Sequence, residues 1–148
     1  MAKRGVELVG FRVQKIGMKN RIFSISSVIY ISCIFILPRL IPQQAMEQVW
    51  NPWSILHIPL YGVLMVLLTF AFLPNLVNSK ASSFNPFSLL LPGGIATLVG
   101  ILDEVNQIFI PYRDASITDV FLDMGGIVLV ALLIIYWQKR KESNRYQE

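Results

Sequence analysis

Four apolar segments, separated by shorter polar stretches, run along the chain and determine its architecture. They cover residues 22–37, 51–73, 87–111 and 116–137, and the first extends to 41 if Pro38 and Arg39 lie at a membrane interface. A helix needs about 20 mainly apolar residues to cross a bilayer. The pattern therefore predicts an all-α integral membrane bundle of four transmembrane helices.

Helix-start signals stand at the edges of the second and fourth segments. Asn51-Pro52 combines a capping residue with a proline in the first turn, and Trp50 and Trp53 flank it as aromatic residues do at the headgroup level. The sequence 116–119, Ser-Ile-Thr-Asp, has the spacing of a capping box. We expect one helix to begin at each of these points.

The third segment leaves its start open. Pro92-Gly93-Gly94 interrupts the apolar run, so the helix begins either near Pro86, with a kink, or at Pro92 after an interfacial piece. In both cases the helix carries its carboxylates close to the end at Pro111, with apolar residues beyond them.

Positive charge is concentrated at the two ends of the chain. Ten of the thirteen Lys and Arg residues lie there: Lys3, Arg4, Arg12, Lys15, Lys19, Arg21, Lys139, Arg140, Lys141 and Arg145. Basic residues are enriched on the cytoplasmic side of membrane proteins, so both termini are expected in the cytoplasm. This gives a basic segment 1–21, a membrane domain 22–137 and a basic tail 138–148, in a multi-pass protein of the cell membrane.

Composition narrows the classes of function. A chain of 148 residues that is 54% hydrophobic suits one membrane domain. The basic ends flank apolar segments, which favours topology over nucleic-acid binding as their explanation. Cys33 is the only cysteine, so an intramolecular disulfide or a cysteine metal cluster is excluded. No cofactor is predicted.

Five of the nine acidic residues fall between 103 and 123: Asp103, Glu104, Asp114, Asp119 and Asp123. Ionisable groups inside a membrane are costly and are taken as functional by default. With four spans, helix two enters from outside and places His57 about two turns below the outer surface. Helix three carries Asp103, Glu104 and Gln107 near its outer end. Asp119 and Asp123 occupy the first two turns of helix four. Three helices therefore bring polar groups to one level near the outer surface.

Helical phase supports this convergence. Side chains four residues apart share a helix face, and three such pairs occur here: His57 with Tyr61, Asp103 with Gln107, and Asp119 with Asp123. Gly126 continues the last face and permits close helix approach. Arg113, in the connecting loop, is the nearest countercharge.

Simpler roles exist for several of these residues. Asp119 can act only as a helix cap, and Tyr61 can serve packing alone. His57 can be a polar group satisfied between helices, and Gln107 a hydrogen-bonding partner for an acid. Asp123 lies too deep for capping. Asp103 and Glu104 are the strongest candidates, because adjacent helical residues point about 100° apart.

A family resemblance rests on these same residues. The chain contains Asp103-Glu104-x-x-Gln107-x-Phe109-x-Pro111-x-Arg113-x-x-Ser116-x-x-Asp119, then Gly126, and also His57-x-x-x-Tyr61. This pattern resembles the signature of the VanZ-like family of small bacterial membrane proteins. Ser54 stands where many members have Lys, and Asp123 where Asn is commoner, so the site is more anionic. The resemblance implies a multi-pass protein and an association with resistance to lipid-anchored glycopeptides such as teicoplanin.

Three functions remain open. One is a non-enzymatic protein that modulates how the envelope handles amphiphilic ligands, with membrane lipids, a lipoglycopeptide or a cell-wall lipid as partner. The second is an intramembrane enzyme whose carboxylates and histidine act on a lipid-linked substrate, with or without a metal ion. The third, proton- or cation-coupled transport, is less favoured because four spans form a pore only in an oligomer.

Overall fold

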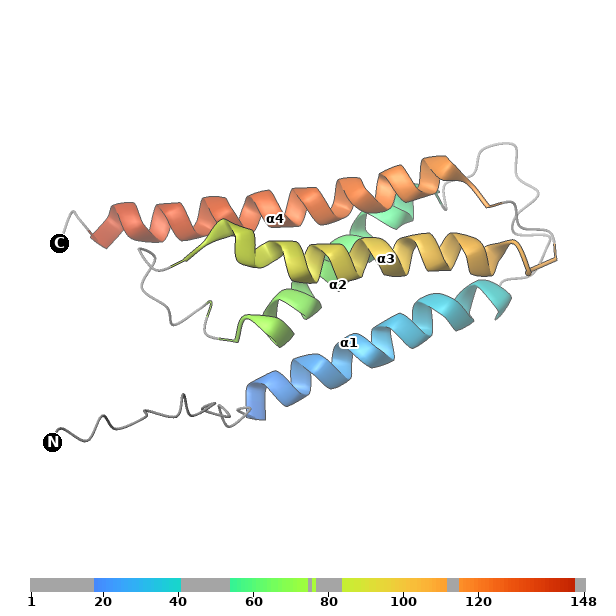
Figure 1. Cartoon of the computed structure of the whole chain (residues 1–148), viewed down its shortest axis with the longest axis horizontal. Coiled ribbons are helices and arrows are strands. Elements are labelled where there is room, and N and C mark those ends of the chain that lie inside the picture. The colour runs from blue at the N-terminus through green and yellow to red at the C-terminus, as the bar shows by residue number, and fades with distance from the viewer. Residues whose placement is uncertain (1–17, 41–53, 75, 77–83, 112–114, 146–148) are drawn as a thin grey trace, which may run out of the picture.

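The computed structural model describes residues 18–40, 54–74, 76, 84–111 and 115–145. Four helices account for most of them (Figure 1). They are α1 (Met18–Ile36), α2 (His57–Phe72), α3 (Leu90–Gln107) and α4 (Ile117–Arg145). The described part of the chain contains no strand. The predicted all-α class is confirmed.

All four helices are long and apolar enough to cross a membrane. With their flanking turns, the four candidate spans cover Arg21–Leu40, Ser54–Phe72, Pro86–Gln107 and Ile117–Asn144. The predicted number of spans is therefore confirmed, and the protein is a multi-pass membrane protein. The predicted cap at Asn51-Pro52, with the two tryptophans beside it, and most of the basic segment 1–21 lie outside the described residues.

The start of the third span is at Pro86. A 3₁₀ turn over Pro86–Leu89 leads directly into α3, and the side chain of Asn85 caps it by accepting a hydrogen bond from the backbone N–H of Phe87 at 3.0 Å. Pro92 lies in the first turn of α3, where a backbone N–H has no partner within the helix. Proline is tolerated there, so the Pro-Gly-Gly sequence does not end the helix.

The fourth helix begins where the sequence predicts and ends later. Ser116 caps it, because its hydroxyl oxygen accepts a hydrogen bond from the N–H of Thr118 at 3.2 Å. We expected the helix to end near Trp137, but it continues to Arg145. Lys, Arg and Glu are good helix formers, and cations are favourable near a helix C-terminus. Gln138 also anchors this extension by donating to the carbonyl of Leu76 at 2.8 Å.

Helix α2 lies at the centre of the bundle, in contact with α1, α3 and α4. Its inward face follows helical spacing and includes Tyr61, Leu64, Met65 and Leu68, all of them buried. Many apolar side chains on the outer faces of the other helices are exposed instead, as suits surfaces in contact with lipid. The hydrophobic core therefore forms around the inward face of α2.

The helices alternate in direction along the bundle. The beginning of α1 and the end of α4 lie at the same end in Figure 1, whereas α3 ends and α4 begins at the opposite end. His57 begins α2 at that opposite end, and Asp103 and Asp119 lie close to it. The polar residues singled out in the sequence therefore lie at the end away from the beginning of α1.

Glycines allow α2 and α4 to pack closely. A Cβ atom added to Gly126 would overlap the backbone carbonyl group of Ile58. From the other side, a Cβ on Gly62 would lie 3.3 Å from a methyl group of Val130 and 3.7 Å from the carbonyl oxygen of Gly126. Small residues that let helix backbones approach are typical of membrane bundles. The predicted role of Gly126 in close approach agrees with this geometry.

We expect Gly126→Ala to destabilise the bundle, because backbone atoms of α2 cannot move aside as a flexible side chain can. Overpacking of this kind costs about 1–3 kcal/mol. The measurement is unfolding of the detergent-solubilised protein followed by circular dichroism. Gly125→Ala is the matched control, since its Cβ would meet nothing within 4 Å. Equal stability of the two variants would contradict the proposed contact.

Candidate functional site

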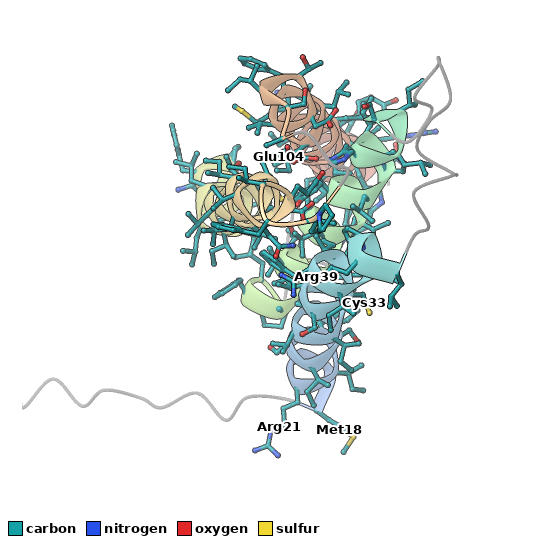
Figure 2. All side chains as sticks on the ribbon, turned by 90° about the vertical axis from the view of Figure 1, so that its right-hand side faces the viewer. Met18, Arg21, Cys33, Arg39 and Glu104 are labelled. Atoms are coloured by element: carbon teal, nitrogen blue, oxygen red, sulfur yellow. The ribbon has the colours of Figure 1, made fainter. Side chains whose placement is uncertain are left out.

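Carboxylate and amide side chains from α3 and α4 are buried together at one end of the bundle. Asp103 and Asp123 are 2% and 1% exposed, and Glu104, Gln107 and Asp119 are also buried. Figure 2 looks onto this end and shows Glu104 between the helices. The sequence predicted that these residues meet at one level, and the structure brings them there.

His57 is joined directly to Asp123. Its Nδ1 atom lies 2.8 Å from Oδ1 of Asp123, across the contact between α2 and α4. Because a carboxylate accepts hydrogen bonds, Nδ1 is the donor, and Nε2 is the nitrogen left for another partner. The ring of His57 is nearly parallel to that of Tyr61, with centroids 6.2 Å apart. The predicted shared face of these two residues is thus observed.

Asp103 accepts two hydrogen bonds on a single oxygen. Tyr61 donates its hydroxyl to Oδ2 at 3.4 Å, and Gln107 donates its amide to the same atom at 3.3 Å. Oδ1 is buried and has no hydrogen-bonding partner. Tyr61 therefore does more than fill space: it links α2 to the acid on α3.

Glu104 connects the end of α3 to the beginning of α4. Its Oε2 accepts a hydrogen bond from the backbone N–H of Ser116 at 2.8 Å, and its Oε1 accepts one from Gln107 at 3.1 Å. In a capping box, the backbone N–H of the cap would bond to the side chain three residues later, here Asp119. Glu104 takes that place, which the local spacing in the sequence could not reveal.

Asp119 is therefore not the reciprocal capping partner. Its side chain is buried, and its Oδ1 has no hydrogen-bonding partner. Asp119 does lie in the first turn of α4, where the helix dipole favours a carboxylate, as its simpler role requires. Its carboxylate also lies within electrostatic range of His57, as does that of Glu104.

Gly100 makes room for the carboxylate of Asp123. A Cβ atom on Gly100 would lie 2.7 Å from Oδ2 of Asp123. That oxygen is buried and has no hydrogen-bonding partner. Gly100 is four residues before Glu104, so Asp123 points at the helix face that carries the other acids. Sequence reasoning did not single out Gly100, and no motif marked it.

The structure adds one positive charge to this end of the bundle that was not predicted from the sequence to lie near the site. Arg39, just after α1, donates to Oδ1 of Asn106 at 2.6 Å, and Asn106 donates in turn to the carbonyl of Phe35 at 3.3 Å. Asn106 lies two residues after Glu104, so Arg39 is at the same end of the bundle as Glu104. From the sequence, Arg39 was considered only as a residue at the membrane interface. Arg113, the predicted countercharge, lies outside the described residues.

A family model confirms the resemblance carried by these residues. The VanZ/LLP1 model matches residues 10–138, which is most of the chain. The chain belongs to the VanZ/LLP1 family. No curated protein and no solved structure shows a significant match to it. In this VanZ/LLP1 protein, the carboxylate of Asp123 is the one that holds His57.

The arrangement combines proton acceptors, donors and potential metal ligands. Among the described residues, His57, Asp103 and Glu104 each offer one ligand atom, and these atoms all lie within 4.8 Å of one another. Ser116 contributes its backbone N–H and its cap to the same region. The VanZ/LLP1 site can therefore bind hydrogen-bonding groups or a cation, and its imidazole can exchange protons.

We expect Gly100→Ala to alter the environment of His57 without changing any polar residue. The new Cβ would displace the Asp123 carboxylate and change its hydrogen bond to Nδ1. Nitrogen NMR of protein labelled in histidine measures this unambiguously, because the chain has a single histidine. Gly94→Ala is the control, since its Cβ meets nothing within 4 Å. An unchanged Nδ1 signal in Gly100→Ala would refute the coupling.

Proposed function

We propose that this protein modulates how the cell envelope interacts with amphiphilic ligands, using the buried polar cluster at one end of the bundle. The carrying observation is the position of that cluster. Asp103 lies four residues before the end of α3, which is about 6 Å along a helix axis, and Asp123 lies about 9 Å into α4. With the helix ends taken as the membrane surface, this is the depth at which the headgroup of an amphiphile meets its acyl chains.

Exposed apolar side chains at this end of the bundle suit the acyl chain of an amphiphile. On α3, the apolar side chains of Leu98, Leu102 and Val105 are about half exposed, at 56%, 47% and 46%. They lie on the outer face of α3, away from the buried Asp103 and Glu104. An acyl chain on this face would lie beside the bundle, and its headgroup would be level with the end of α3 that carries the acids. Exposed apolar surface is typical of a site that contacts a membrane or a lipid ligand.

The charge of the cluster indicates which headgroups it favours. The described part of the site contains four buried carboxylates and one imidazole: Asp103, Glu104, Asp119, Asp123 and His57. Carboxylates accept hydrogen bonds and attract cations. Hydroxyl, amide and amine groups, such as those of a lipoglycopeptide or of a sugar- and peptide-bearing cell-wall lipid, are complementary. Membership of the VanZ/LLP1 family supports ligands of this kind.

The proposal requires the cluster to face outward. With both termini in the cytoplasm, the inside would carry the ten basic residues of the chain ends together with Lys80, and the outside only Arg39 and Arg113. The even number of spans fits this arrangement.

A reporter fusion tests this orientation. We expect alkaline phosphatase, active only outside the cytoplasm, to be active when fused after Pro111 and inactive when fused after Lys80. A cytoplasmic fluorescent reporter at the same two positions is the control and should give the opposite pattern. Activity after Lys80 but not after Pro111 would place the cluster on the cytoplasmic side and end the proposal.

A second candidate is an intramembrane enzyme that acts on a lipid-linked substrate. The observation in its favour is the His57–Asp123 pair, because a carboxylate that orients an imidazole is a common arrangement for general acid–base catalysis. Asp103, with one unpartnered buried oxygen, lies on the neighbouring helix and could act as the second proton-transfer group. This candidate differs from the first in requiring a chemically changed product.

We expect a knockout complemented with the wild-type gene to bind a fluorescent lipoglycopeptide differently from one complemented with Asp103→Asn or Glu104→Gln. Loss of one charged hydrogen bond, about 1.5–3 kcal/mol, corresponds to about a tenfold to hundredfold change in affinity. The readouts are ligand bound per cell and susceptibility to lipidated and non-lipidated glycopeptides. An Arg113→Ala copy tests the loop cation predicted from the sequence.

Glu142→Gln is the matched control, because it removes the same charge near the far end of α4. Mass spectrometry of the recovered ligand and envelope lipids separates the two candidates. Changed binding with chemically intact ligand and lipids supports modulation, whereas a site-dependent product supports the enzyme. Equal binding by the knockout, both site variants and wild type would refute the role in ligand handling.

A further inference from the structure

Three potential metal ligands meet inside the cluster, and they come from two different helices. One ligand atom each from His57, Asp103 and Glu104 lies within 4.8 Å of the others. We propose that this site binds one divalent first-row metal ion, Zn²⁺ or Mn²⁺, through the imidazole and the two carboxylates. Asp123, Gln107 and Tyr61 position these ligands and do not themselves bind the ion.

Unpartnered buried oxygens point to a missing positive partner. Asp103 is 2% exposed, and its Oδ1 has no hydrogen-bonding partner, although Oδ2 accepts from both Tyr61 and Gln107. A buried carboxylate oxygen without a partner is strongly unfavourable in apolar surroundings. Buried charges are paired or coordinate metals, and the described part of the chain places no Lys or Arg in hydrogen-bonding contact with Asp103 or Glu104.

The histidine is held as metal-binding histidines usually are. In metalloproteins, one ring nitrogen binds the ion while the other donates to a carboxylate, which fixes the tautomer and the orientation of the ring. His57 has this second contact, because Nδ1 donates to Asp123 at 2.8 Å. Nε2 is then the nitrogen whose lone pair is available to bind an ion.

The carboxylate ligands are oriented in a similar way. Gln107 donates to both Asp103 and Glu104, at 3.3 Å and 3.1 Å, and so fixes the two acids relative to each other. Each carboxylate oxygen has two acceptor positions, so an oxygen that accepts one hydrogen bond can still bind an ion. The hydrogen bond from Ser116 to Glu104 is therefore compatible with metal binding.

The ligand set indicates the kind of ion. Imidazole suits Zn²⁺ and other first-row ions, whereas Mg²⁺ and Ca²⁺ favour all-oxygen sites. Ligands about 2.0–2.2 Å from one ion lie within about 4 Å of each other. Side-chain movements of about 1 Å would bring the three ligand atoms from within 4.8 Å to that spacing. Two carboxylates and one dication are together neutral, which removes most of the cost of burying the acids.

Direct metal binding tests the proposal. Full-length protein in detergent is stripped with a chelator and titrated with ZnCl₂ or MnCl₂, with bound metal measured by elemental analysis and by loss of the free Mn²⁺ EPR signal. We expect about one ion per chain for wild type. Asp103→Asn and Glu104→Gln should lose binding, and Asp123→Asn should bind about tenfold to hundredfold more weakly, the usual effect of a residue that orients a ligand.

Glu142→Gln should bind like wild type, since Glu142 lies near the opposite end of α4. Pulsed EPR of the Mn²⁺ form should show coupling to one imidazole nitrogen that disappears in His57→Gln. Wild-type binding well below one ion per chain, or full binding by both Asp103→Asn and Glu104→Gln, would overturn the proposal. The experiment contains no lipoglycopeptide and no cell-wall lipid, so its failure is distinguishable from failure of the proposed envelope function.

Discussion

Burying carboxylates between apolar helices is the constraint on which this bundle depends. An acid at such a depth is costly unless donors or cations surround it. The close approach of α2 and α4 at Gly126 brings His57 within reach of Asp123, and Gly100 on α3 leaves the space that the Asp123 carboxylate occupies. Gly126 on α4, Gly100 on α3 and the imidazole of His57 on α2 thus set the position of the Asp123 carboxylate together. Helix packing and site geometry are consequences of the same contacts.

The second half of the site is organised from α3. Gln107 holds Asp103 and Glu104 with one amide group, and Tyr61 on α2 reaches the same oxygen of Asp103. Donors from two helices therefore converge on acids from one. Arg39 does not join this network directly. It donates a hydrogen bond to Asn106 on α3, and so attaches the end of α1 to the C-terminal end of α3.

Local sequence patterns predicted which residues are buried at one level but not how they pair. The spans, the number of helices, the cap at Ser116 and the shared faces of His57 with Tyr61 and Asp103 with Gln107 follow from spacing alone. The hydrogen bond from Ser116 to Glu104, the fit of Asp123 against Gly100 and the contact of Arg39 with Asn106 depend on how far each helix is rotated and shifted against its neighbours. Periodicity within one helix carries no information on that. The extension of α4 to Arg145 was missed because the change from apolar to basic residues marks a change of environment and not the end of a helix.

Glu104 illustrates how chemistry and architecture share one side chain. Its Oε2 accepts a hydrogen bond from the backbone N–H of Ser116, the residue that caps α4. The same carboxylate is part of the polar cluster. A ligand that moves this carboxylate therefore also affects its hydrogen bond to Ser116 at the start of α4. Ligand binding at the cluster is therefore coupled through Ser116 to the start of α4, whereas the hydrogen bonds to Asp103 come from the side chains of Tyr61 and Gln107.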